Sequence, residues 1–217
     1  LFLDMWNAFY PKKDINYETF KEDTLAERAL TLANPAQGFV QVYGDTPLDN
    51  EPLGENVYRD MLNIAQDYVY IYTPYLVISY ELQTAMTLAA RRGVDVRLMT
   101  PGIPDKKMVF RMTRSYYRPL IEAGVKIYEF SPGFLHAKTF VADDRLASVG
   151  TINLDYRSLY LHFELSAMLY DHPVIPTIKA DFLATQAQAR QITLADTRNT
   201  LTGMLWDAVL RIVAPFV

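Results

Sequence analysis

The sequence predicts an α/β fold in which the strands of a layered sheet alternate with helices. Segments rich in β-branched and aromatic residues alternate with segments of helical composition, and the breaks Thr100-Pro101-Gly102 and Ser131-Pro132-Gly133 each end a strand. Half of the 217 residues are hydrophobic, which is enough for a substantial core. Strands separated by helical segments favour a sheet that carries helices on both faces.

The expected elements follow from these local patterns. Short apolar runs bounded by turn residues predict strands over residues 39–43, 68–73, 94–99, 125–130, 137–142, 146–149 and 164–170. Longer segments with helical spacing predict helices over residues 55–66, 81–91, 105–121, 173–190 and 200–213. Residues 1–36 are rich in charge and end in a stretch with the composition of a linker. We therefore expect them to form a connecting segment ahead of one domain over residues 37–217.

The overall composition excludes several classes of protein. A net charge of −4 argues against a nonspecific polyanion binder, and we expect no nucleic-acid partner. No apolar run reaches the ~18 residues that a membrane span needs, and no secretory signal pattern is present. The absence of cysteine excludes disulfides and thiolate metal sites and fits a reducing compartment.

The segment over residues 133–164 gathers the residue types that phosphodiester chemistry needs. His136 and Lys138 are two positions apart, so on an extended strand their side chains leave the same face. Imidazole can attack phosphorus or protonate a leaving oxygen, the ammonium can hold non-bridging oxygens, and the Asn153 amide adds a donor. These residues predict a site for a phosphate ester.

His136-x-Lys138-x-x-x-x-Asp143, followed by Gly150-Thr151-x-Asn153, resembles the signature of the phospholipase D superfamily. The flanking segments resemble bacterial cardiolipin synthases over most of residues 39–171. These segments are TPYLV, AARRGVDVRLMTPG, RSYYRPLIEAGVKIYEFSPGFLHAKT and VGTINLDYRSLYLHFE. The resemblance implies the phospholipase D-like mixed sheet flanked by helices. It also implies ping-pong phosphatidyl transfer, in which one histidine forms a phosphohistidine and a second protonates the departing alcohol.

The chain has three histidines, and only His136 has a lysine two positions on. The motif is therefore present once, and the resemblance implies a site that needs two copies. Two explanations are open: the chain is the second half of a longer synthase, or it completes the site by homodimerisation. Residues 1–10 resemble the helix after the first motif of full-length synthases, which favours the first explanation. By analogy with two-motif members, His136 is then the general acid and base.

Other residues of the matching span have less direct roles. The resemblance implies that Glu164 orients the motif histidine, the alternative being an ordinary glutamate at a strand edge. We assign Asp143 to the catalytic motif but favour a structural or charge-balancing role, because such carboxylates often only organise a turn. Thr151 follows Gly150, whose lack of a side chain would let the chain pass close to a phosphate, and could donate to it.

A second group of cations lies outside the motif. Lys107, Arg111, Arg114 and Arg118 follow a rhythm of four, three and four, which places all of them on one face of the expected helix. This basic stripe could bind an anionic phospholipid, or it could be a solvated helix face. Residues 155, 157 and 158 match the sequence of cardiolipin synthases. They could form a scaffolding ion pair, or they could contact the substrate.

We expect no metal and no other cofactor. The sequence has no paired carboxylates at the site, no histidines at ligand spacing and no cysteine. Lys138 supplies the positive charge that a metal ion would otherwise provide.

The apolar stretch over residues 201–217 is interrupted by Asp207 and Arg211, one helical turn apart as a potential ion pair. It could dock on the core, or lie in a lipid interface with Trp206 near the headgroups.

Together these observations predict the C-terminal catalytic half of a cardiolipin synthase-like phosphatidyltransferase that acts on phosphatidylglycerol. Its expected partners are the anionic lipid, a membrane surface, and an N-terminal half or a second copy. Its expected location is the cytoplasmic face of a bacterial membrane. The alternatives are a hydrolytic phospholipase D or phosphodiesterase, and an inactive lipid-binding half.

Overall fold

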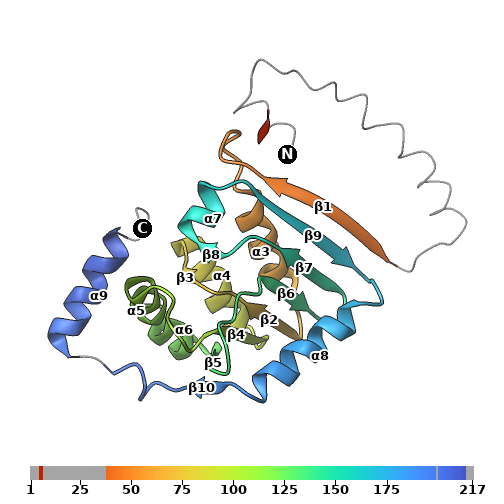
Figure 1. The fold of residues 1–217 in the computed structure, drawn as a ribbon. Coiled ribbons are helices and arrows are strands. Elements are labelled where there is room, and N and C mark those ends of the chain that lie inside the picture. Colours follow the sequence, from red (N-terminus) through yellow and green to blue (C-terminus); the bar gives the residue numbers. More distant parts are fainter. Residues whose placement is uncertain (1–4, 7–37, 199, 214–217) are drawn as a thin grey trace, which may run out of the picture.

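The computed structural model describes residues 5–6, 38–198 and 200–213 and contains a central eight-stranded sheet (Figure 1). Its strand order is β1-β9-β7-β6-β2-β4-β5-β10, and β3 and β8 form a separate two-stranded sheet. The strands are β1 (Phe39–Asp45), β2 (Tyr68–Tyr72), β3 (Leu76–Val77), β4 (Asp95–Pro101), β5 (Lys126–Phe130), β6 (Thr139–Ala142), β7 (Leu146–Gly150), β8 (Leu154–Asp155), β9 (Glu164–Tyr170) and β10 (Arg190–Ile192). The predicted connecting segment over residues 1–36 lies outside the described residues, apart from residues 5 and 6.

The central sheet is mixed. Strands β2, β4 and β5 pair in parallel, whereas β6 pairs antiparallel with β2, and β7, β9 and β1 continue the antiparallel part. The register pairs Tyr72 at the end of β2 with Thr139 at the start of β6. The segment before β6 therefore emerges at the carboxyl edge of the parallel strands, where ligands commonly bind in α/β sheets.

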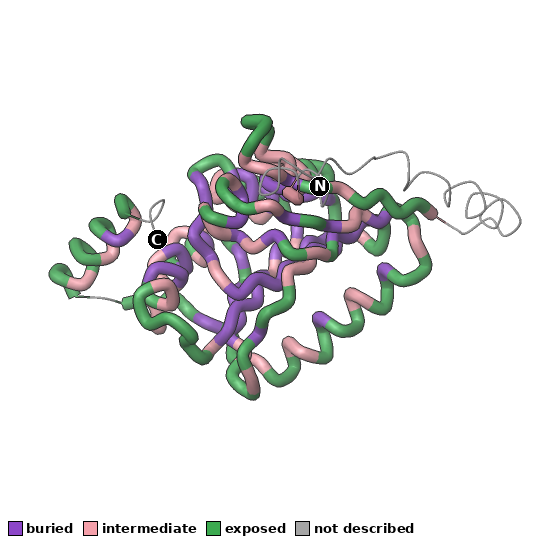
Figure 2. The backbone as a smooth tube through the Cα atoms, turned by 45° about the horizontal axis from the view of Figure 1, so that its top comes forward, coloured by how far each residue is buried: buried purple, intermediate pink, exposed green. Residues whose placement is uncertain are grey.

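Alternation along β2 explains why both faces of the sheet are covered. Tyr68, Tyr70 and Tyr72 point to one face and pack with Phe182, whereas Val69 and Ile71 join the core on the other face. All five residues of β2 are buried, as expected for a central strand between two layers, and the central strands are largely buried in Figure 2. The predicted α/β fold with helices on both faces is confirmed.

The helices are α3 (Leu53–Ile64), α4 (Tyr80–Arg91), α5 (Lys107–Ser115), α6 (Tyr117–Ala123), α7 (Tyr156–Tyr160), α8 (Ile175–Gln186) and α9 (Leu201–Val213). Residues from α3, α4, α5 and α6 belong to the core on the Val69 face, whereas α8 packs on the tyrosine face. Ser79 begins α4 by accepting a hydrogen bond from the Leu82 amide at 3.0 Å.

The single helix predicted over residues 105–121 is wrong, because two helices separated at Tyr116 occupy this segment. Pro119 explains the break: a proline inside a helix lacks an amide donor and clashes with the carbonyl four residues earlier, here that of Ser115. That carbonyl instead accepts a hydrogen bond from Arg211 of α9.

The helix predicted over residues 173–190 is too long at both ends. Helix α8 begins after Val174, with Pro176 in its first turn, and ends at Gln186. Arg190 then opens β10, which pairs antiparallel with β5, so tertiary pairing overrides the local helical pattern.

Helix α9 docks on the domain by its polar stripe. Asp207 forms an ion pair with Arg111 of α5 at 2.9 Å, Arg211 lies over the Tyr116 ring, and Leu210 is buried. The opposite face is apolar and open, with Leu201 and Ile212 exposed by 83% and 74%. Figure 2 shows α9 as a mostly exposed helix at the rim of the domain.

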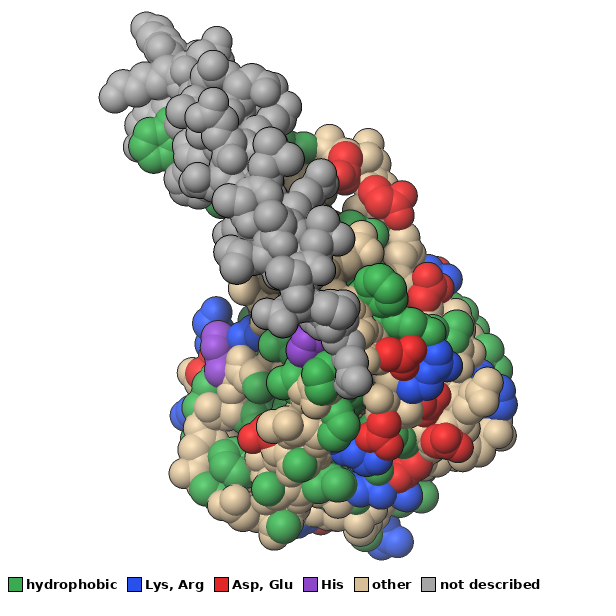
Figure 3. Space-filling model, turned by 90° about the vertical axis from the view of Figure 1, so that its right-hand side faces the viewer, with side chains coloured by type: hydrophobic (Ala, Val, Ile, Leu, Met, Phe, Trp, Pro, Cys, Tyr) green, Lys and Arg blue, Asp and Glu red, His purple; other side chains and the backbone are tan. Residues whose placement is uncertain are grey.

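On the face drawn in Figure 3, acidic and basic side chains lie next to each other, with hydrophobic side chains between them. Among the described residues, Arg145 forms an ion pair with Asp171 at 3.1 Å and Lys179 with Asp144 at 2.9 Å. Among the described helices, none has the length and apolar character to cross a bilayer.

Candidate active site

His136 and Lys138 lie in the extended segment that leads into β6. The strand predicted over residues 137–142 begins later, at Thr139, so Lys138 precedes it. Lys138 Nζ donates to the His136 carbonyl at 2.7 Å, and both residues line one open depression at the carboxyl edge of β2. The structure thus brings the two predicted residues together on a surface that a ligand can reach.

Thr151 and Asn153 line the same depression and reach it through the pairing of β7 with its neighbours. Gly150 donates its amide to the Lys138 carbonyl at 3.3 Å, which places the residues after β7 beside Lys138. A Cβ at Gly150 would lie 2.4 Å from the Leu165 carbonyl oxygen. Glycine is therefore required by the close approach of β9, a reason that the sequence argument about phosphate did not anticipate.

Asn153 is the amide with unused hydrogen-bonding capacity. Its backbone N–H donates to Ser158 Oγ at 2.8 Å, which fixes the residue ahead of β8. Its side-chain Oδ1 is buried and has no hydrogen-bond partner in the described structure. A buried amide oxygen is costly to leave unsatisfied, so this atom favours a ligand that donates a hydrogen bond.

Glu164 is buried and holds the loop behind the depression. Its carboxylate accepts hydrogen bonds from Ser158 Oγ at 2.5 Å and from the Thr151 hydroxyl, and it lies 3.7 Å from His162 Nδ1. The predicted contact with the His136 ring is not among the hydrogen bonds that the described residues form. Because the Thr151 hydroxyl is donated to Glu164, Asn153 is the better placed of the two residues for binding phosphate.

Asp143 stands at the opposite end of β6 from His136. Its carboxylate accepts three backbone N–H groups, from Gln66 at 2.7 Å, Asp67 at 3.0 Å and Tyr68 at 2.8 Å. Its φ of 54° lies in the left-handed region, which aspartate tolerates better than most residues. These contacts give Asp143 a structural role between α3 and β2, and its place in the motif does not bring it to the depression.

The electrostatics of the depression disfavour the protonated form of the His136 imidazole. Burial lowers the pKa of His136, the charge of Lys138 lowers it further, and Asp105 opposes both. Burial also lowers the pKa of Lys138, while the charges of Glu164 and Asp155 act in the opposite direction and favour the ammonium. A neutral ring beside a cation suits an atom that must accept a proton or attack phosphorus.

The basic stripe is largely paired with carboxylates. Arg111 contacts Asp207, Arg114 contacts Glu129 at 3.2 Å, and Arg118 contacts Glu122 at 2.9 Å within α6. Lys107 is exposed at the start of α5. Because most of its charge has a counter-ion, the stripe has less free charge for lipid headgroups than its sequence pattern suggests, and lipid binding there stays a prediction.

Within residues 38–198 and 200–213, the structure contains no cluster of three or more His, Asp or Glu side chains that could hold a metal ion. The charge that faces the depression comes from Lys138.

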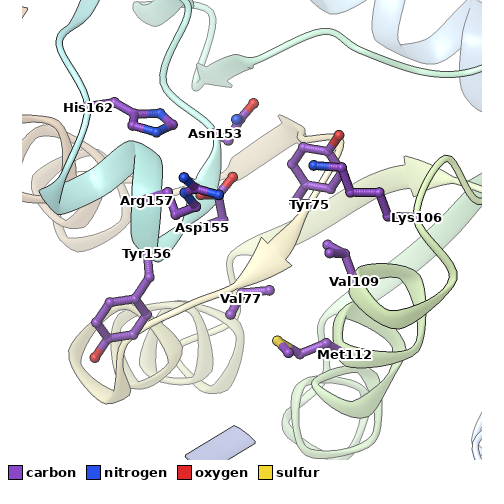
Figure 4. A pocket seen from close by; sticks show the side chains of 10 residues that line it. All are labelled: Tyr75, Val77, Lys106, Val109, Met112, Asn153, Asp155, Tyr156, Arg157 and His162. Atoms are coloured by element: carbon purple, nitrogen blue, oxygen red, sulfur yellow. The ribbon is translucent and has the colours of Figure 1, made fainter. Parts of the chain in front are cut away.

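Sequence reasoning missed a second hollow beside the depression, shown in Figure 4. It is lined by Tyr75, Lys106, Val109 and His162 among others, and Asn153 belongs to both hollows. The position of Lys106 after β4 is the signal that could have indicated it, since residues after parallel strands meet at the carboxyl edge of a sheet.

A mixed sheet with a His-x-Lys pair and an asparagine around one open depression defines a member of the phospholipase D superfamily. More narrowly, the chain belongs to the family described as "Cardiolipin synthase, PLD-like domain", whose family model matches residues 58–185.

Relatives with sequence similarity agree with this family. The chain is 40% identical over 182 residues to a cardiolipin synthase of Geobacillus sp. (strain WCH70), covering 83% of this chain and 36% of that protein. It is 47% identical over its full length to a Streptococcus mutans protein described as uncharacterized, of which it covers 46%. The chain thus spans less than half the length of the curated relatives that it matches.

Solved structures share the fold at low sequence identity. Phosphatidylserine synthase from Haemophilus influenzae matches 94% of this chain and 54% of its own, with a TM-score of 0.66 and 16% identity. Nuc from Salmonella typhimurium, a phospholipase D family member, matches 72% of this chain and 99% of its own, with a TM-score of 0.60 and 16% identity. Both matches show that this chain shares the fold of these proteins.

Proposed function

We propose that this chain is the C-terminal catalytic half of a cardiolipin synthase-like phosphatidyltransferase that acts on phosphatidylglycerol through a phosphohistidine. The observation that carries the proposal is the single open depression shared by His136, Lys138 and Asn153. It holds one reactive ring, one cation and one amide, which are the groups that a tetrahedral phosphate needs on one side.

The reaction needs a second histidine on the opposite side of the phosphorus. In the first step, that histidine attacks phosphorus, the P–O bond to glycerol breaks, and protonated His136 gives its proton to the departing oxygen. In the second step, an acceptor hydroxyl gives its proton to neutral His136 and attacks phosphorus as the P–N bond breaks. Lys138 and Asn153 hold the non-bridging oxygens throughout. The lowered pKa of His136 favours the neutral ring that the second step uses.

Two features support a second half, from the same polypeptide or from a second copy, as the partner. His136 is the one histidine that lines the depression in the described structure. The adjoining sheet surface is apolar and open, with Val149 and Leu165 exposed by 40% and 46%.

The apolar outer face of α9 supports a peripheral position on a membrane, and we propose the cytoplasmic face. Leu201, Leu205, Trp206 and Ile212 are exposed there, a composition that suits the headgroup region of a bilayer.

The deciding experiment uses a chimera in which this chain replaces the residues that it matches in the Geobacillus cardiolipin synthase, incubated with labelled phosphatidylglycerol. The chimera should form cardiolipin and release glycerol, and His136→Ala should reduce turnover at least ~10²-fold. A covalent phosphatidyl adduct that accumulates in His136→Ala supports the acid and base role. Loss of the adduct makes His136 the nucleophile instead. His172→Ala is the matched control, because His172 lies at the turn before α8, where its Nδ1 accepts from the Val174 amide.

Product analysis separates transfer from hydrolysis. Phosphatidic acid without cardiolipin would identify a hydrolytic phospholipase D. Turnover that depends on EDTA-removable metal would contradict the role of Lys138 as the source of positive charge.

A further inference from the structure

The second hollow lies against the catalytic depression, between β3, β8, α5 and α7, and has a volume of about 250 Å³. Its apolar lining comes from Val77, Val109 and Met112, of which Val77 and Met112 are buried. This volume is just below the range of ~300–1,000 Å³ that is typical of small-molecule sites, so it fits a headgroup rather than an acyl chain.

The polar lining carries both signs of charge. Figure 4 shows Asp155 and Arg157 on one side of the hollow and Lys106 on the other, with Asn153 at the side shared with the depression. Asp155 Oδ1 caps α7 by accepting from the Ser158 amide at 3.0 Å. Arg157 is exposed and forms no ion pair with Asp155 in the described structure, so the scaffolding pair that the sequence left open is not formed.

Asn153 links the two hollows, because this residue lines both spaces. Its side-chain Oδ1 is buried and has no hydrogen-bond partner in the described structure. A hydroxyl group placed at this boundary could donate to Oδ1 and lie beside the phosphate held by His136 and Lys138. Two cations, one carboxylate and an apolar floor together match a polyol that carries a phosphodiester.

We propose that this hollow is the acceptor site and that it binds the glycerol headgroup of a second phospholipid. Asp155 and Asn153 accept hydroxyl hydrogens, Lys106 and Arg157 attract the phosphodiester, and Val109 packs against the glycerol carbons. One terminal hydroxyl then forms the new P–O bond while the P–N bond to histidine breaks, and neutral His136 takes the proton. Water needs no such site, so hydrolysis does not depend on it. The inference rests on the proposed phosphatidyl transfer.

Binding to this chain tests the site without requiring turnover. Glycerophosphoglycerol, the deacylated headgroup, is titrated into the chain while methyl signals of Val77, Val109 and Met112 are followed by NMR. We expect saturable shifts that Val109→Trp abolishes by filling the hollow, and Arg157→Gln should weaken binding about tenfold. Leu88→Trp and Arg91→Gln, both exposed on α4, are the matched controls and should bind as the wild type does. Unmoved methyl signals, or equal binding by Val109→Trp and wild type, would overturn the assignment.

Product partition in the chimera tests the acceptor role itself. Val109→Trp and Arg157→Gln should lower cardiolipin about tenfold or more while glycerol release continues, so that phosphatidic acid rises relative to cardiolipin. If cardiolipin and phosphatidic acid fell equally, the hollow would be assigned to the donor lipid and the inference would be overturned. A wild-type chimera that forms neither product would contradict the proposed function, and the binding experiment would then decide the site alone.

Discussion

His136 and Lys138 are two basic side chains that line the same depression. His136 is exposed and Lys138 is half-buried, and the partial loss of water around each is the main cause of its lowered pKa. A lowered pKa means that the folded chain binds the His136 proton less tightly than the unfolded chain does. His136 therefore reduces folding stability as the pH falls through its ordinary pKa, and the effect is absent at higher pH.

Replacing Lys138 by methionine should raise the pKa of His136, because it removes a positive charge that disfavours the imidazolium. The measurement is a pH titration of the His136 ring signals by NMR in the chain alone. Lys107→Met, which removes an exposed lysine from α5, should leave that titration unchanged. An unchanged or lower His136 pKa in Lys138→Met would show that the two side chains do not interact in solution.

Asp143 carries a second prediction at this scale. Asp143→Ala should lower the free energy of unfolding by about 2–4 kcal/mol, because three backbone N–H groups lose a charged acceptor and alanine is strained at positive φ. Urea unfolding measures the change, and Asp60→Ala on the exposed face of α3 is the control. Lost turnover at unchanged stability would instead favour a catalytic role.

At the scale of elements, local patterns predicted most strands, and tertiary contacts decided the rest. The alternating tyrosines of β2 and the break after β5 are visible in the sequence, whereas β10 forms only because β5 offers a free edge. The break at Tyr116 could have been predicted from the sequence, because Pro119 disfavours a helix that continues from the preceding turn. His136, Lys138 and Asn153 were predictable because a local motif fixes them. The partners of Glu164 were not, since they depend on how β9 packs beside the loop after β7.

The approach of β7 to β9 gives a prediction about Gly150. Gly150→Ala should lower the free energy of unfolding by about 2–4 kcal/mol, because its Cβ would lie 2.4 Å from the Leu165 oxygen and 2.5 Å from Ser166 Cα. Gly133→Ala is a matched control, since nothing lies within 4 Å of the Cβ that it adds. Thermal unfolding compares the two variants, and equal midpoints would show that the two strands separate at little cost.

Removal of α9 tests its outer face. A chain that ends at Thr200 should float less with vesicles that contain phosphatidylglycerol, because it loses the exposed Leu201, Leu205, Trp206 and Ile212. Leu205→Ser with Ile212→Ser should reproduce the loss and keep the contacts of Arg111 with Asp207, which face the domain. Flotation that is unchanged in both would restrict α9 to a docking role.

For the whole molecule, the proposed function raises the question of which surface would receive a second motif-bearing half. Helix α8 packs against the tyrosine face of β2 and reaches β6 and β7, while the same face of the sheet continues over β9 and β1. The register pairs both Val149 and Val42 with Ala167, so these side chains share that face with Leu165. This surface, formed by Val42, Val149 and Leu165, adjoins the depression through Val149.

A second motif-bearing half that packs on this surface would bring its histidine toward His136. The burial of exposed apolar surface would stabilise the complex by about 25 cal/mol per Å². Val149→Lys with Leu165→Lys should therefore abolish the association of this chain with itself or, in the chimera, cardiolipin formation, because buried unpaired charge prevents close packing. Sedimentation velocity and product analysis measure the two effects. Leu88→Lys is the control, since Leu88 is exposed by 53% on α4, within the helical layer on the other face of the sheet. Normal cardiolipin formation by the double variant would place the partner on a different surface and require the second histidine to approach His136 from there.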